Sequence, residues 1–206
     1  MNRVRFPSRF SRRVLAVAAA TGAVAVAGVT AASVAMAAPS TSAGSFTFKL
    51  APAAGITSCL PHAGGKVTIT PDISSDKMTI SVNGLPGVQH YALFDLQQPT
   101  KPFGVATFLT YISVGKDGHG STTVNGIFDS RTFSMSLGGS ATFAPTHEFH
   151  LGIWFNNPKT PFKLGCEPGA TKPVVTPFNG THNAGILVLG TAQFPASAGP
   201  LSHVAR

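Results

Sequence analysis

The sequence has 206 residues, of which 11% are charged, and its formal net charge is +8. Five of the fifteen basic residues are arginines within the first thirteen positions, so the rest of the chain carries a charge of about +3. Its eight lysines are spread singly from Lys49 to Lys172, which excludes the clustered basic surface that nucleic-acid binding requires.

The first part of the chain has the three regions of a secretory signal peptide. Arginines precede an apolar run over residues 14–29, and Ala35-Met36-Ala37 fits the small-residue rule for cleavage. We predict a signal peptide over residues 1–37, cleaved before Ala38, with no stable membrane span afterwards. The adjacent Arg12 and Arg13 also fit a twin-arginine signal, and the choice between the two export routes stays open.

The part of the chain that follows the signal peptide is long enough for one domain. We predict a flexible start over residues 38–44, a single domain over 45–194 and a mobile tail over 195–206. The protein is expected outside the cell or associated with the cell envelope, as a monomer.

Alternation of apolar and polar residues with a period of two predicts strands through most of the domain. In chain order these are residues 45–50, 66–70, 78–82, 88–96, 103–112, 118–128, 132–137, 147–155 and 186–189. Glycine and proline interrupt the chain every 8–12 residues or so, which is typical of sandwiches and barrels. We predict an all-β fold, an antiparallel β-sandwich of the immunoglobulin-like or jelly-roll-like kind, with residues 103–112 as a central strand.

Cys59 and Cys166 are the two cysteines of the sequence, and a pair of cysteines in an exported protein usually forms a disulfide. Two free thiols or a metal site are the alternatives, and neither has further ligands at a suitable spacing. We predict a Cys59–Cys166 bridge, which would hold a long loop over residues 156–177.

The sequence contains no familiar catalytic motif: no Gly-x-Ser-x-Gly elbow, no phosphate-binding glycine loop and no paired-carboxylate signature. Most of its acidic residues fall in predicted turns, where Asp stabilises the backbone locally. Because a triad can assemble from distant residues, a hydrolase of unknown type stays open as a third interpretation. We predict no catalytic residues and no cofactor.

Seven histidines are the candidates for metal binding. His147 and His150 are three residues apart, so on a strand their side chains point to opposite faces and cannot chelate together. We predict no metal site. A site assembled from His150, His182 and a third residue on another strand stays open.

Trp154 is the one tryptophan, and alternation places it on the strand face of His150, opposite Leu151 and Ile153. If that opposite face packs into the core, Trp154 lies on the outer face, where an exposed ring would suit contact with a carbohydrate or a protein. Alternatively, the loop of residues 156–177 covers it.

The segment of residues 176–186 breaks the β pattern and is rich in Asn, Gly and His. Loops on a rigid β framework are common places for binding groups, although a structural turn explains the same composition. We predict a ligand-binding site formed by His150, Trp154, His182 and Asn183.

Three segments carry a likeness to known sequences: HEFHLGIWFNNP at 147–158, GC at 165–166 and TPFNGTHNAGI at 176–186. With NGLP at 83–86 and PFGV at 102–105, they resemble an uncharacterised family of secreted bacterial proteins that share an HxFHLGxWF…GC…TPFNGxHNAG pattern. The resemblance implies secretion and carries no activity that could be transferred.

These observations favour a secreted, non-enzymatic protein that acts by binding an unknown protein or carbohydrate, or as a structural module of the cell envelope. The alternative is an extracellular protein that binds a metal or a small ligand through clustered histidines.

Overall fold

The computed structural model describes residues 44–204 except 129–132, 139 and 178–182, and over residues 133–144 it describes the backbone alone. The predicted signal peptide and His182 therefore lie outside the described residues.

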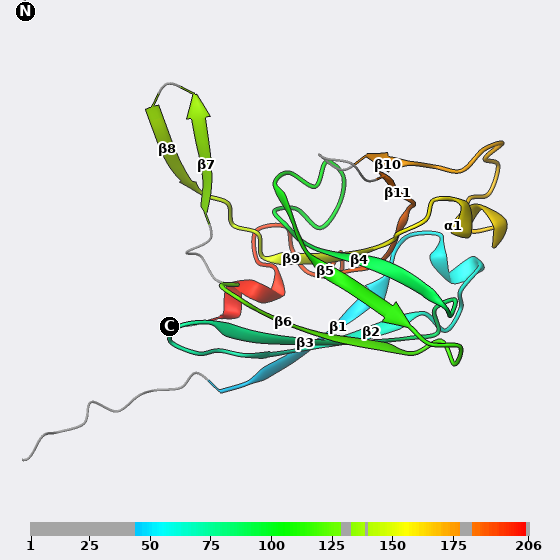
Figure 1. The fold of residues 1–206 in the computed structure, drawn as a ribbon, viewed down its shortest axis with the longest axis horizontal. Coiled ribbons are helices and arrows are strands. Elements are labelled where there is room, and N and C mark those ends of the chain that lie inside the picture. The colour runs from blue at the N-terminus through cyan, green and yellow to red at the C-terminus, as the bar shows by residue number, and fades with distance from the viewer. Residues whose placement is uncertain (1–43, 129–132, 139, 178–182, 205–206) are drawn as a thin grey trace, which may run out of the picture. The chain divides into compact units, whose positions relative to one another are not determined.

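Eight antiparallel strands close into a barrel in the order β1-β12-β9-β4-β5-β6-β3-β2 (Figure 1). Their bounds are β1 Phe46–Pro52, β2 Gly64–Thr70, β3 Asp76–Asn83, β4 Gln89–Leu96, β5 Ala106–Val114, β6 Gly120–Gly126, β9 His150–Phe155 and β12 Leu187–Gly190. Two strand pairs form separate small sheets, β7 (Phe133–Gly138) with β8 (Ser140–Pro145) and β10 (Thr176–Pro177) with β11 (Asn183–Ala184). The helical turns are η1 (Ile56–Ser58), α1 (Lys159–Lys163) and η2 (Pro200–His203).

The prediction of a β-sandwich, immunoglobulin-like or jelly-roll-like, is wrong, because the sheet closes on itself. β1 pairs with β2 along Phe46–Leu50 and with β12 at Ala51 and Pro52. The first and last strands of the barrel are thereby joined. Alternation shows which residues of a strand face the core, but it does not show which distant strand lies beside it.

The hairpin of β2 and β3 illustrates how alternation builds the core. Val67 and Ile69 lie opposite Ile80 and Met78, and all four side chains are fully buried. The turn between the strands is held by Asp72, whose carboxylate accepts a hydrogen bond from the Ser74 backbone N–H at 3.1 Å. Inward side chains of this kind fill the interior of an eight-stranded barrel.

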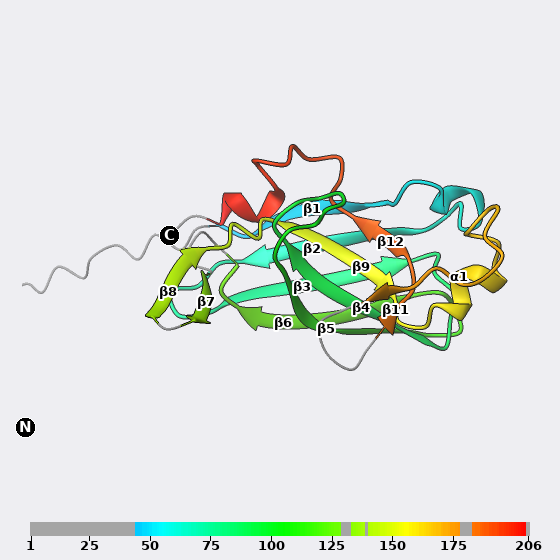
Figure 2. The same ribbon diagram turned by 90° about the horizontal axis from the view of Figure 1, so that it is seen from above.

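The strand β9 is buried on both faces. It lies between β4 and β12 (Figure 2). Leu151, Ile153 and Phe155 face the main core, while Trp154 joins a second buried cluster on the outer face. The predicted alternation within residues 147–155 is confirmed from His150 onward.

The strand β5 does not occupy the central position predicted for residues 103–112. Its N-terminal residues Ala106, Thr107 and Phe108 are exposed, and burial begins at Ile112. The apolar composition of residues 103–112 therefore does not show that β5 is buried, because the first half of the strand lies at the surface.

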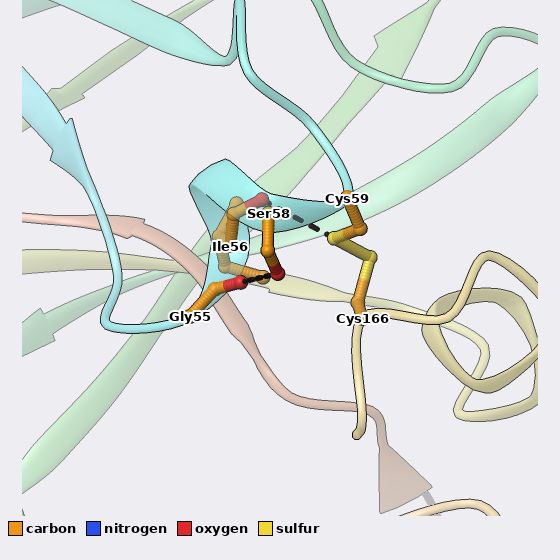
Figure 3. Close-up of a disulfide and its surroundings, with 5 residues drawn as sticks. All are labelled: Gly55, Ile56, Ser58, Cys59 and Cys166. Atoms are coloured by element: carbon orange, nitrogen blue, oxygen red, sulfur yellow. Dashed lines mark hydrogen bonds between the residues drawn. A yellow bond between two sulfur atoms is a disulfide. The ribbon is translucent and has the colours of Figure 1, made fainter.

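The predicted disulfide is confirmed: Cys59 and Cys166 are bonded, with their Cα atoms 5.1 Å apart (Figure 3). The Sγ of Cys59 also lies 3.2 Å from the carbonyl oxygen of Ile56. Since a disulfide sulfur has no proton to donate, this is a close contact and not a hydrogen bond. The bridge ties the segment after α1 to the turn η1.

Residues 200–204, the last that the structure describes, pack against the barrel, and the mobility expected over residues 195–206 stays a prediction. Leu201 is fully buried, and its backbone N–H donates to the carbonyl of Phe149 at 3.1 Å. Within the described residues, no helix is long and apolar enough to cross a membrane.

Candidate functional site

Two half-exposed aromatic side chains lie on the outer face of β5. Phe108 is 46% and Tyr111 45% exposed. On a regular strand, residues three apart would point to opposite faces. Here the pairing with β4 shifts between Leu93 and Phe94, which leaves Leu109 as an extra residue of β5. This β-bulge brings both rings to one face.

These two rings form one end of a continuous row of aromatic side chains. In order, the row consists of Tyr111, Phe108, Phe94, Trp154 and Phe103. Successive ring centroids in this order are 4.9, 5.4, 5.5 and 5.2 Å apart. Such separations and tilted or edge-on arrangements are favourable for aromatic pairs. The row therefore runs without a break from the buried Trp154 to the half-exposed Tyr111.

Polar side chains lie beside the exposed end of the row. The imidazole of His90 lies 6.4 Å from the Tyr111 ring, and its Nδ1 lies 3.0 Å from Oγ of Ser113. The sequence has no charged residue between Lys101 and Lys116. This surface can stack on an apolar face and exchange hydrogen bonds, but it offers no charge to an ionic ligand.

Of the predicted site residues, Trp154 is 1% exposed, so its ring is not an accessible contact. It belongs to a buried cluster against which Phe103 and Leu187 pack. A Cβ at Gly152 would overlap the indole, so the glycine gives the ring room to lie against β9. Trp154 is thus the buried member of the aromatic row and packs against Phe94 and Phe103.

His150 is fully buried beneath the chain end and is also inaccessible. Its Nε2 lies 3.1 Å from the carbonyl oxygen of Ala196, and its Nδ1 lies 3.1 Å from Oγ1 of Thr191. A carbonyl only accepts, so Nε2 carries the proton and Nδ1 accepts from the threonine. Burial lowers the pKa of His150, although the Ala196 carbonyl opposes this effect. His150 thus fastens the C-terminal segment as a neutral imidazole.

The remaining predicted site residues are Asn183 and His182. Asn183 is exposed on β11, where it pairs with Pro177. Its neighbour Ala184 belongs to the same buried cluster as Trp154. His182 lies outside the described residues, so the ligand role of the four residues stays a prediction.

A buried pair of carboxyl groups lies at one end of the barrel. Asp95 is on the inward face of β4, two residues after Leu93, and it is 4% exposed. Glu148, 5% exposed, is the central residue of a tight turn in which Phe149 N–H bonds to the His147 carbonyl at 2.9 Å. Among the described residues, neither Oδ1 of Asp95 nor Oε1 of Glu148 has a hydrogen-bond partner.

Burial raises the pKa of Asp95 well above its ordinary value, and the neighbouring charge of Glu148 raises it further. A carboxyl in this setting favours its neutral form. Because both groups are nearly inaccessible, their main effect is on stability and not on an external substrate. Within the described part of the chain, no three His, Cys, Asp or Glu side chains gather as a metal site would require.

No protein-family model matches this chain, and no curated protein matches it either. The resemblance to a family of secreted bacterial proteins therefore stays a prediction.

Proposed function

We propose that this protein is exported and acts without catalysis, as a binding protein that holds a neutral carbohydrate on the outer face of β5. The observation that carries the proposal is the pair of half-exposed rings, Phe108 and Tyr111, on a strand without charges. Sugar rings present a face of C–H groups that packs against the electron-rich face of an aromatic ring.

The surroundings of the two rings support a hydroxyl-rich ligand over an ionic one. His90 and Ser113 offer hydrogen-bond donors and acceptors on the face of the two rings. The buried part of the aromatic row supports the exposed rings, so ligand binding would order few side chains. The Cys59–Cys166 bridge is consistent with an oxidising compartment and supports export.

Binding is tested with the chain from Ala38 onward, passed over a panel of immobilised neutral and charged polysaccharides. We expect retention by a neutral polysaccharide, and Phe108→Ala and Tyr111→Ala should each weaken it about tenfold or more, as for other central aromatic contacts. Val175→Ala is the control, because Val175 is similarly exposed at 47% but lies on another segment.

Equal retention of all three variants would contradict the proposal. Binding only to charged polymers, abolished by about 0.5 M salt, would also contradict it, because that behaviour marks surface electrostatics. Export is tested by the intact mass of the protein in the medium, which should correspond to a chain that begins at Ala38.

A further inference from the structure

The backbone of β5 has an edge that no barrel strand covers. β5 pairs with β4 from Ala106 to Val114, but its pairing with β6 is confined to Val114 and Gly120 within the described residues. Figure 1 shows the two strands separating from their shared turn. We call the side of Ala106–Thr110 that faces away from β4 the β5 edge.

The burial of side chains agrees with an uncovered edge. Ala106, Thr107 and Phe108 are consecutive residues, so they point alternately to the two faces of the sheet, and all three are exposed. By contrast, all six residues of β9 are buried. The first half of β5 therefore has neither a layer on its faces nor a described strand along its outer side.

The chemistry of the β5 edge favours strand pairing. Natural sheets protect exposed edges with charged residues, proline or bulges. Residues 103–115 contain no charge and no proline, and Thr, Phe, Tyr, Ile and Val dominate β5. The bulge at Leu109 is the one protective feature, and it occupies a single position. A strand of this composition pairs readily with another.

We propose that the β5 edge pairs antiparallel with the β5 edge of a second copy of this chain, which forms a two-fold dimer with one continuous sheet. Antiparallel pairing of a strand with itself is self-complementary, as a closed two-fold interface requires. Because the strand has no charged residue, pairing with a second copy places no like charges opposite one another. The strand also has no charged side chain that would favour a different protein as its partner.

The aromatic rings give the pairing a further source of stability. Paired strands lie about 4.8 Å apart, so the Phe108 and Tyr111 rings of both copies would share one outer face near the joint. Part of their exposed surface would be buried there. One strand pair is smaller than a standard interface, so we expect a dissociation constant of roughly 1–100 µM. This dimer goes beyond the proposed function and replaces the expectation of a monomer.

The test combines sedimentation with a scan of single cysteines. The native Cys59 and Cys166 are bonded to each other, so an added cysteine is the one reactive thiol expected. Thr107, Leu109, Thr110 and Ser113 are each changed to cysteine and oxidised near the dissociation constant. A residue close to a two-fold axis lies beside its own copy, so cross-linking should peak at one of these positions. Ser81→Cys is the control, because it is exposed on β3, which is paired on both sides.

Sedimentation should show a monomer–dimer equilibrium, and Thr107→Lys should weaken it at least tenfold, while Ser81→Lys leaves it unchanged. Far-UV circular dichroism checks that both lysine variants are folded. A monomer at all concentrations up to about 1 mM, above the expected range, or cross-linking as strong at Ser81 as on β5, would overturn the proposal. A monomer that still binds carbohydrate would overturn the dimer alone, so the two proposals fail separately.

Discussion

Asp95 is an acidic residue at an inward position of the barrel, and its surroundings favour the protonated carboxyl. The main cause is burial, and the nearby Glu148 adds a repulsive charge. The folded protein therefore holds a proton that the unfolded chain releases near the ordinary Asp pKa of about 3.9. From that pH up to the raised pKa, the free energy of unfolding decreases as the pH increases.

Asp95→Asn should remove this pH dependence, because the amide has a similar shape and no charge to bury. We expect the variant to gain about 1–3 kcal/mol in the free energy of unfolding at pH 7 and little at pH 4. Urea unfolding at both pH values measures the change. Asp117→Asn, in the exposed turn between β5 and β6, is the control. A variant destabilised equally at both pH values would show that Asp95 has a purely structural role.

At the scale of single residues, alternation in the sequence predicts which face of the sheet a side chain occupies only where the strand is regular. The alternation of Leu151, Ile153 and Phe155 was predictable and is confirmed. The shared face of Phe108 and Tyr111 was not predictable. It results from the bulge at Leu109, which brings residues three apart to one face and leaves no recognisable pattern in the sequence. Asp95 lies in the strand predicted over residues 88–96, but alternation gives no sign that its carboxyl is buried near Glu148.

At the scale of elements, the disulfide holds a segment that has little core of its own. From α1 to Pro177 the chain forms no barrel strand, and Pro161 and Cys166 are its buried positions. The bridge joins residues 107 apart and so restricts the unfolded chain strongly. The presence of two cysteines in a chain with a predicted signal peptide was enough to predict it, whereas the short α1 has no helical periodicity to detect.

Replacing both cysteines by alanine should lower the free energy of unfolding by about 2–4 kcal/mol. Amide hydrogen exchange should increase mainly over residues 159–175 and around η1, because those segments lose their tie to each other. The barrel strands β2, β3 and β9 provide the internal control. Uniformly faster exchange throughout the barrel, or no change near the bridge, would contradict a local role.

At the scale of the whole molecule, the eight barrel strands and their alternation were accessible from the sequence, but β8, β10, β11 and the closure of the barrel were not. The barrel closes through β1 and β12, which meet at Ala51↔Gly190 and Pro52↔Leu189. A pairing between residues so distant leaves no local pattern, and sandwiches and barrels share the same turn spacing. In the closed barrel the first half of β5 lies at the surface, whereas the predicted sandwich placed residues 103–112 in a central strand.

The same closure determines where the protein can act. Inward side chains fill the barrel, so the proposed binding is on its outside, where β5 offers both an aromatic face and an uncovered backbone edge. The face is proposed to bind carbohydrate and the edge to bind a second copy. A dimer would bring two such faces into one continuous surface and increase retention on a polymer through avidity.

The proposed binding of a ligand on the outer face of β5 is tested most directly by nuclear magnetic resonance. An isotope-labelled protein is titrated with soluble oligosaccharides of the polysaccharide that retains it. We predict that the largest shifts fall on Thr107–Ser113 and His90, and that Ser81 on β3 and the loop of residues 169–175 stay unchanged. Shifts centred on β11 or on the 169–175 loop, with β5 unaffected, would contradict the account.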